Sequence, residues 1–304
     1  MNKKKLISLL LIPIAISVVS LGALVPSDSI FKPKNVNWMS EVSDETLIRN
    51  LSIPGTHDSG ARHSIADVAG KCQDLSIDSQ LRIGTRFFDL RLQLIEDEFQ
   101  IVHSFVKQKL YFEDVIDDLA SYVRTNKSEF LIISIKKEES SVDSSLGFEE
   151  ALLRDLDNYK DVISFDSVIP NKVKDARGKI YIISRFDGSI GVPAYMGWED
   201  STTFTLGNLY VQDNYCIDNV EIKKDDIIST INYSNSNSNE LVLNFTSCYL
   251  DYGFPPTYAG TTAKAINPWL KKYLENNNQD LGIVIVDFIS EDLSSLIYRR
   301  NFHE

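Results

Sequence analysis

Cysteine and histidine are scarce in this 304-residue chain, which contains three of the first and four of the second. Cys72, Cys216 and Cys248 are odd in number and lack the spacing of metal ligands. They therefore indicate neither a disulfide framework nor a zinc site. We expect them to behave as small buried hydrophobic residues.

An excess of positive charge is also absent. The chain has 31 Lys and Arg against 43 Asp and Glu, which gives a formal charge of −12, and no basic stripe interrupts this pattern. Such a surface repels nucleic acid, so we expect no nucleic-acid partner. It also repels strongly anionic membranes, so contact with lipid would depend on aromatic insertion or on a local basic pocket.

The length and the 43% apolar content are sufficient for one large buried core. Near the N-terminus, three lysines precede the uncharged apolar run Leu6–Val25, a pattern that indicates export. We expect residues 1–26 to be a signal peptide or a retained membrane anchor, residues 27–37 a linker, and residues 38–304 one folded domain.

Short apolar runs rich in β-branched residues alternate with stretches of helical length, which is typical of parallel β/α units. About eight strands can be counted, the number of a TIM barrel. We therefore predict the α/β class, as a single TIM-type β/α barrel, regular or distorted. The predicted strands are Leu51–Ile53, Thr85–Leu90, Gln100–Val102, Phe130–Ile135, Lys179–Ser184, Leu209–Val211, Leu241–Phe245 and Gly282–Val286.

Helices are predicted at Phe112–Tyr122, Phe148–Leu156 and Ala263–Leu274, where apolar residues recur on one face. No clear long helix separates the first two strands. Ser140–Ser145 and Ser234–Glu240 are polar and low in complexity, so we expect surface loops there.

Polar residues that can handle a proton or a phosphate follow almost every apolar run. In a β/α barrel the carboxyl ends of the strands share one face, where active sites form. A lone strand-end cation or carboxylate is usually a solvated group or a helix cap. Many such residues at successive strand ends are informative together. The set comprises His57, Asp58, Asp89, Arg91, His103, Lys136, Arg185, Asp213, Tyr215, Ser247 and Asp287.

Two histidines in this set could form a base and acid pair. His57 and His103 have three candidate carboxylate partners, Asp58, Asp89 and Asp287. The other histidines receive simpler interpretations: His63 as a loop residue near the site and His303 as part of the C-terminal tail.

Three cations in the set suit a phosphodiester. Arg91, Lys136 and Arg185 could surround one anion whose negative charge grows in the transition state. Asp213, Tyr215 and Ser247 are groups that can hold a polyol. The residues thus indicate cleavage of a phosphodiester attached to a sugar-like group. Because a fixed guanidinium beside the phosphate would repel a cation, we expect no metal and no cofactor.

Seven segments in order resemble the bacterial phosphatidylinositol-specific phospholipases C, across nearly all of residues 38–300. They are SIPGTHDSG (Ser52–Gly60), GTRFFDLR (Gly84–Arg91), ISIKKE (Ile133–Glu138), DARGKIYIISR (Asp175–Arg185), VQDNY (Val211–Tyr215), LNFTS (Leu243–Ser247) and VIVDFISE (Val284–Glu291). The resemblance implies a phospholipase C barrel at residues 38–304 that converts phosphatidylinositol to diacylglycerol and inositol 1,2-cyclic phosphate, and then hydrolyses the cyclic product slowly.

The resemblance also implies catalytic roles. His57 matches the general base that takes the proton of the inositol 2-hydroxyl, and Asp287 matches the carboxylate that orients it. Arg91 matches the arginine that stabilises the phosphate. His103 matches the general acid for the leaving diacylglycerol, with Asp58 as its partner.

Six residues are expected to bind the substrate: Lys136, Arg185, Asp213, Tyr215, Ser247 and Asp89. The resemblance implies that Tyr215 stacks on the inositol ring. One departure is that Ser104 follows His103, where the family usually has glycine. The arginine at Arg91 agrees with the metal-independent branch of the family.

The segment Cys248–Gly260 carries four aromatic residues, Tyr249, Tyr252, Phe254 and Tyr258. Such residues either insert at the headgroup level of a membrane or pack on the barrel and the pocket. We expect a monomer that meets phosphatidylinositol in membranes. The expected location is outside a Gram-positive cell, secreted or tethered.

Two alternatives remain at this stage. A glycerophosphodiesterase-like barrel would need a divalent metal. A catalytically inactive barrel could bind inositol or another sugar without reacting.

Overall fold

A computed structural model describes residues 36–63, 70–236, 239–251 and 258–302. The predicted export segment and most of the linker lie outside these residues, as do His303, Tyr252 and Phe254. Within the described ranges, no helix is both long and apolar enough to cross a membrane.

One parallel sheet forms the centre of the described structure, with its order confirming an α/β fold of the distorted TIM-barrel type. The sheet is curled and open, because the two edge strands of this path are not paired with each other in the described part of the chain. Every neighbouring pair along it is parallel except the last. The order is β6 (Ile163–Ser164), β7 (Ile180–Arg185), β5 (Leu131–Lys137), β2 (Phe87–Ile95), β1 (Ile53–Thr56), β14 (Ile283–Val286), β12 (Leu241–Phe245), β10 (Leu209–Gln212) and β9 (Thr203–Leu206).

The prediction for Gln100–Val102 was wrong in one respect. These residues do form a strand, but β3 (Glu98–His103) runs antiparallel to β2 and forms a hairpin with β4 (Val106–Tyr111) instead of a parallel unit. Apolar alternation alone does not distinguish a hairpin strand from a barrel strand. The remaining short strands are β8 (Val192–Pro193), β11 (Cys216–Ile217) and β13 (Tyr249–Leu250).

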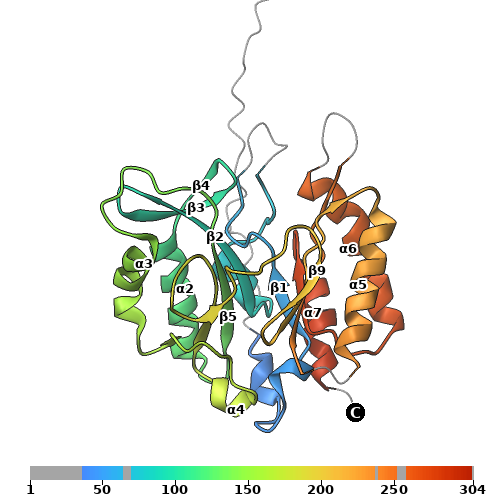
Figure 1. Ribbon diagram of the computed structural model, residues 1–304. Coiled ribbons are helices and arrows are strands. Elements are labelled where there is room, and N and C mark those ends of the chain that lie inside the picture. Colours follow the sequence, from blue (N-terminus) through green and yellow to red (C-terminus); the bar gives the residue numbers. More distant parts are fainter. Residues whose placement is uncertain (1–35, 64–69, 237–238, 252–257, 303–304) are drawn as a thin grey trace, which may run out of the picture. The chain divides into compact units, whose positions relative to one another are not determined.

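The three predicted helices are confirmed as α2 (Phe112–Thr125), α3 (Phe148–Leu156) and α6 (Ala259–Asn276). The first two flank β2 and β5, whereas α6 lies with α5 and α7 on the other side (Figure 1). Among the described residues between β1 and β2, the six-residue α1 is the one α-helix. The other helices are α1 (Ile77–Arg82), α4 (Val173–Ala176), α5 (Val220–Ser234) and α7 (Glu291–Tyr298), with short 3-10 turns at Trp38–Glu41, Ile48–Asn50, Asp157–Tyr159 and Arg299–Phe302.

Strand residues alternate between two buried layers, as the two-residue period of a strand requires. In β14, Ile283 and Ile285 belong to the interior cluster of the sheet, whereas Val284 and Val286 pack beneath α5, α6 and α7. The next interior position is therefore Asp287. The same alternation places polar residues inside at the carboxyl ends of the other strands.

Candidate active site

Three cations lie side by side at the carboxyl ends of neighbouring strands. Arg91 of β2 is in register with Lys136 of β5, and Lys136 is in register with Arg185 of β7. Because neighbouring strands are about 4.8 Å apart, this register forms a short row of positive charges. The sequence predicted the three residues, and the strand pairing explains why they meet.

His57 and Asp287 come together from opposite ends of the chain because β1 pairs with β14. The Nδ1 of His57 lies 2.8 Å from Oδ1 of Asp287, and its Nε2 lies 2.7 Å from Nη2 of Arg91. Arginine can only donate, so Nε2 must accept and Nδ1 must carry the proton. His57 is thus held as the neutral tautomer, with its base nitrogen turned toward Arg91.

The pKa of His57 reflects opposing effects. Burial is the largest single influence and lowers it, but the charge and the hydrogen bond of Asp287, together with the charge of Asp58, raise it, and the net pKa lies above the ordinary value for histidine. The positive charge of Arg91 lowers the pKa of His57, and the negative charge of Asp58 raises it. A raised pKa makes the neutral imidazole a stronger base.

A second pair, His103 and Asp58, lies on the other side of Arg91. The Nδ1 of His103 is 2.7 Å from Oδ2 of Asp58, and Nε of Arg91 is 3.2 Å from the other carboxylate oxygen. Burial raises the pKa of Asp58, but Arg91 and His103 lower it by more, and the net pKa lies well below the usual range. Asp58 is therefore ionised, and Nε2 is the nitrogen that His103 can offer a ligand.

The turn after His103 adopts a conformation that favours glycine. Ser104 has a φ of +50°, in the left-handed region that glycine enters without steric cost. The serine therefore keeps the turn that presents His103 to the site, and its backbone N–H donates to Oε1 of Glu138 at 3.3 Å.

Arg91 is the centre of the charge network. Its guanidinium lies 3.3 Å from Asp89 and 3.3 Å from Glu138, in addition to its contacts with the two histidine pairs. Burial lowers the pKa of Arg91, but the surrounding carboxylates raise it by more. Asp89 is fully buried and also contacts Arg185 at 3.4 Å. Asp89 thus lies beneath the arginines.

A pocket of about 780 Å³ opens above this network. In its lining the Trp198 ring stacks on the Arg185 guanidinium, with 3.8 Å between the guanidinium carbon and the ring centroid. The indole N–H of Trp198 donates to Asp213 at 3.0 Å. Trp198 therefore fixes one cation and one carboxylate of the pocket at once.

The pocket lining also contains hydroxyl groups suited to a polyol. The Tyr215 hydroxyl donates to the Asp200 carboxylate. Ser247 is buried, lines the pocket and has no hydrogen-bond partner for its hydroxyl among the described residues. Lys136 contacts Glu138 at 2.7 Å and stays partly exposed. The pocket lining therefore presents both donors and acceptors.

Known phospholipases are similar to this chain in sequence. A family model described as "Phosphatidylinositol-specific phospholipase C, X domain" matches residues 52–185. A 1-phosphatidylinositol phosphodiesterase of Staphylococcus aureus is 28% identical over 311 residues, covering 94% of this chain and 94% of the relative. One of Listeria monocytogenes is 26% identical over 276 residues, covering 87% and 84%.

Solved structures extend the likeness to the fold. A mutant of the S. aureus phosphatidylinositol-specific phospholipase C has a TM-score of 0.78 at 26% identity, covering 90% of this chain and 98% of that one. The L. monocytogenes enzyme has a TM-score of 0.73 at 25% identity, covering 88% and 98%. Over most of its length this chain is therefore similar to the bacterial phosphatidylinositol-specific phospholipases C.

Most of the predicted site residues meet at one pocket. Asp58 and Asp89 do not line it, because both lie behind Arg91, and His63 is absent from its described lining. The predicted residues that line the pocket are His57, Arg91, His103, Lys136, Arg185, Asp213, Tyr215, Ser247 and Asp287.

Four residues of the site were not predicted. Glu138 had a usable signal, because it lies two positions after Lys136 and so continues the same strand face. Trp198 and Asp200 lie on an irregular loop without periodicity. Cys72 was predicted only as a buried residue, which it is, but its sulfur also lies 3.5 Å from Nδ1 of His103.

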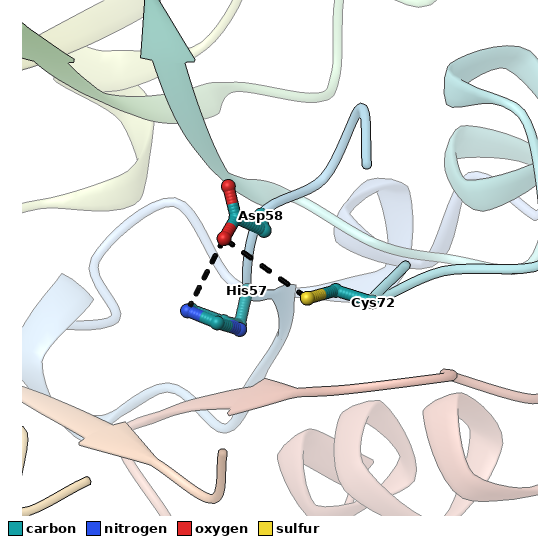
Figure 2. Close-up of side chains that lie close together, drawn as sticks. All are labelled: His57, Asp58 and Cys72. Carbon is teal, nitrogen blue, oxygen red and sulfur yellow. Dashed lines mark hydrogen bonds and ion pairs between the residues drawn. The ribbon is translucent and has the colours of Figure 1, made fainter. Parts of the chain in front are cut away.

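Among the residues that the structure describes, the group of donors that could hold a metal ion is His57, Asp58 and Cys72 (Figure 2). Their fit to a cation is poor. The His57 Nε2 that would bind it is engaged by Arg91, whose fixed positive charge opposes a second cation. Burial also raises the pKa of the Cys72 thiol well above its usual value, whereas metals bind the thiolate.

Proposed function

We propose that this protein is a metal-independent phospholipase C that cleaves phosphatidylinositol to diacylglycerol and inositol 1,2-cyclic phosphate. The observation that carries the proposal is the pair of histidines, each held at Nδ1 by a carboxylate, on the two sides of one partly buried arginine. This arrangement offers a base, an acid and a cation for the phosphate between them.

In the first step, Nε2 of His57 takes the proton of the inositol 2-hydroxyl, and the freed oxygen attacks phosphorus. Asp287 stabilises the imidazolium that forms. The substrate hydroxyl must replace the Arg91 nitrogen now bonded to Nε2. Arg91 then donates to the phosphate, while its contacts with Asp58 and Asp89 hold the guanidinium plane.

In the second step, the bond from phosphorus to the glycerol oxygen breaks and His103 gives this oxygen a proton. His103 is the more exposed histidine of the two, which suits a leaving group that remains in lipid. In the slow second reaction the roles reverse: His103 takes a proton from water, and His57 returns one to the 2-oxygen of inositol.

The remaining pocket residues are proposed to hold the inositol ring. Lys136, Arg185 and Asp213 would contact its hydroxyls, and Tyr215 would stack on its face. Ser247 would use its unpartnered hydroxyl in the same way. Asp89, being fully buried, would act through Arg91 and Arg185.

Phosphorus NMR of phosphatidylinositol in mixed micelles, with excess EDTA, tests the proposal. We expect the signal of a five-membered cyclic phosphodiester, at a rate that added calcium leaves unchanged. Activity only after calcium is restored would place the chain with metal-dependent phosphodiesterases. No product under either condition, with inositol still bound, would indicate a binding module.

A lipid surface is proposed to meet the mouth of the pocket. Phe105 and Met196 are 76% and 82% exposed, at the tip of the β3–β4 hairpin and on the loop before Trp198. Tyr195 and Tyr249 are also exposed, and Phe105, Tyr195, Tyr249 and Tyr258 line the pocket. Exposed apolar side chains around a cavity are typical of a membrane-contacting rim.

Replacing Phe105 and Met196 together by serine should weaken binding to phosphatidylcholine vesicles by about 10-fold or more, since each buried apolar side chain contributes about 1.5–3 kcal/mol. Turnover of soluble inositol cyclic phosphate should change by no more than about threefold, because neither residue contacts the catalytic pairs. Vesicle sedimentation measures the first quantity.

Val168→Ser is the matched control for the rim. Val168 is 56% exposed but lies near Leu209 and Leu241, at the amino ends of β10 and β12. We expect unchanged vesicle binding for this variant. Equal weakening by Val168→Ser would show that binding does not depend on the pocket mouth. We also propose that the protein is exported. We further propose that it acts as a monomer, which a sedimentation profile of the purified domain tests.

A further inference from the structure

The His57–Asp287 pair lies just beyond the end of a strand ladder. The last contact of the ladder is the His57 N–H, which donates to the Val286 carbonyl at 3.2 Å. The residue that follows each member of the pair has a positive φ: Asp58, after His57, has a φ of +43°, and Phe288, after Asp287, has a φ of +50°. Such left-handed conformations persist only where surrounding contacts fix them. The ladder by itself therefore does not set the spacing of the two side chains.

Gln73 connects the two strand ends. Its side chain is fully buried, and its Nε2 donates to the carbonyl of His57 and to the carbonyl of Val286, each at 2.8 Å. Its Oε1 accepts from the Ile289 N–H at 3.2 Å. Both amide protons and the carbonyl oxygen are thus used on the main chain that carries the histidine and the aspartate.

The backbone of the same segment is anchored as well. The Cys72 carbonyl accepts from the Phe288 N–H at 2.7 Å, and the N–H groups of Cys72 and Gln73 donate to the Ala61 carbonyl at 2.8 and 3.0 Å. The segment therefore contacts the chain after β1 and the chain after β14 at the same time. A rigid support of this kind can transmit position to the two catalytic side chains.

We propose that Gln73 is a positioning residue of the His57–Asp287 pair, holding the two strand ends at the spacing that gives the Nδ1–Oδ1 contact of 2.8 Å. Its kinetic consequence depends on the proposed function, but its effect on the pair needs no substrate. A methionine at this position would keep the length of the side chain and remove all three hydrogen bonds.

The consequence for His57 has a definite sign. Asp287 favours the protonated imidazole, so a longer contact lowers the pKa of His57. The other charged groups that face His57 are Arg91 from β2 and Asp58 from the turn after β1. Neither bonds to the Gln73 side chain in the described structure, so their effects should change little.

The experiment compares Gln73→Met with Gln80→Met in the purified full chain. Gln80 is also fully buried, and it donates to the carbonyls of Ser59 and Leu75 at 2.9 and 2.8 Å and accepts from the Thr56 hydroxyl at 2.8 Å. It bonds to neither His57 nor the end of β14. Both variants lose the same number of buried hydrogen bonds.

Proton–nitrogen NMR titration of the His57 ring is the primary measurement. We expect Gln73→Met to lower the pKa of His57 by about half a unit or more and kcat by about 10- to 100-fold, since small misplacements of catalytic groups are costly. Gln80→Met should lower the denaturation midpoint to a similar extent and leave the His57 titration unchanged. If Gln73→Met fails to fold, Gln73→Asn takes its place. This variant keeps the amide but reaches only one carbonyl, so we expect an intermediate shift of the His57 pKa.

An unchanged His57 titration in a folded Gln73 variant would overturn the proposal, and so would an equal shift in Gln80→Met. The experiment distinguishes a failure of the Gln73 proposal from a failure of the proposed function. If the wild-type chain does not cleave phosphatidylinositol, the proposed function fails, whereas the titration still decides whether Gln73 positions the pair.

Discussion

Replacing His57 by alanine should lower kcat on phosphatidylinositol by about 10⁴-fold, the upper range for loss of a general base. The imidazole is the group whose Nε2 faces the reaction space, and its Nδ1 is already committed to Asp287. KM should change by less than about threefold, because the proton transfer occurs in the transition state. Phosphorus NMR or a soluble chromogenic inositol phosphodiester gives both constants.

His63→Ala is the matched histidine control. His63 is a described residue whose backbone bonds to Gln108, and its side chain is not part of the pocket lining. We expect wild-type kcat for this variant. A similar loss in both variants would show that the effect of His57→Ala arises from folding instead of proton transfer.

The pH dependence of kcat/KM gives a second test of the same role. A base must be neutral to act, so activity rises as pH passes through the pKa of His57. Because Asp287 raises that pKa, the rise should lie above the ordinary pKa of histidine. Asp287→Asn removes the raising charge, so the rise should move toward lower pH while the maximum falls. If kcat/KM of Asp287→Asn rises at the same pH as in the wild type, Asp287 does not have the proposed role.

The two-residue period of the strands explains how much of the site could be predicted. Phe87, Asp89 and Arg91 occupy alternate positions of β2, so an interior apolar residue predicts that the two polar residues after it also face inward. The same holds for Ile285 and Asp287. Strand-end position selected these residues in the sequence, and the two-residue period explains why they face the same side.

What could not be predicted depends on irregular backbone. Gln73 and Trp198 lie on loops, where no period relates a residue to a face, and their partners are main-chain carbonyls or side chains distant in the sequence. The prediction that Gln100–Val102 forms a parallel strand was wrong for a related reason. Its apolar alternation was correct, but pairing direction depends on the turn that follows and not on the alternation.

Substituting Arg91 by lysine should lower kcat by about 10³-fold, comparable to the loss of a preorganised oxyanion donor. Lysine keeps the positive charge that balances Asp58, Asp89 and Glu138, so the fold should persist. However, one ammonium group cannot contact these carboxylates and also present a planar pair of donors to a phosphate. The loss should therefore fall on kcat while the thermal midpoint changes little.

Arg124→Lys provides the matched control for this change. Arg124 also makes a two-nitrogen contact with a carboxylate, Asp161, at 2.8 and 2.6 Å, but on the exposed surface of α2. Exposed pairs contribute about 0–1 kcal/mol, and we expect unchanged kcat. If Arg91→Lys kept kcat within about tenfold of wild type, positive charge alone would suffice at this position, and the planar donor geometry would have no catalytic role.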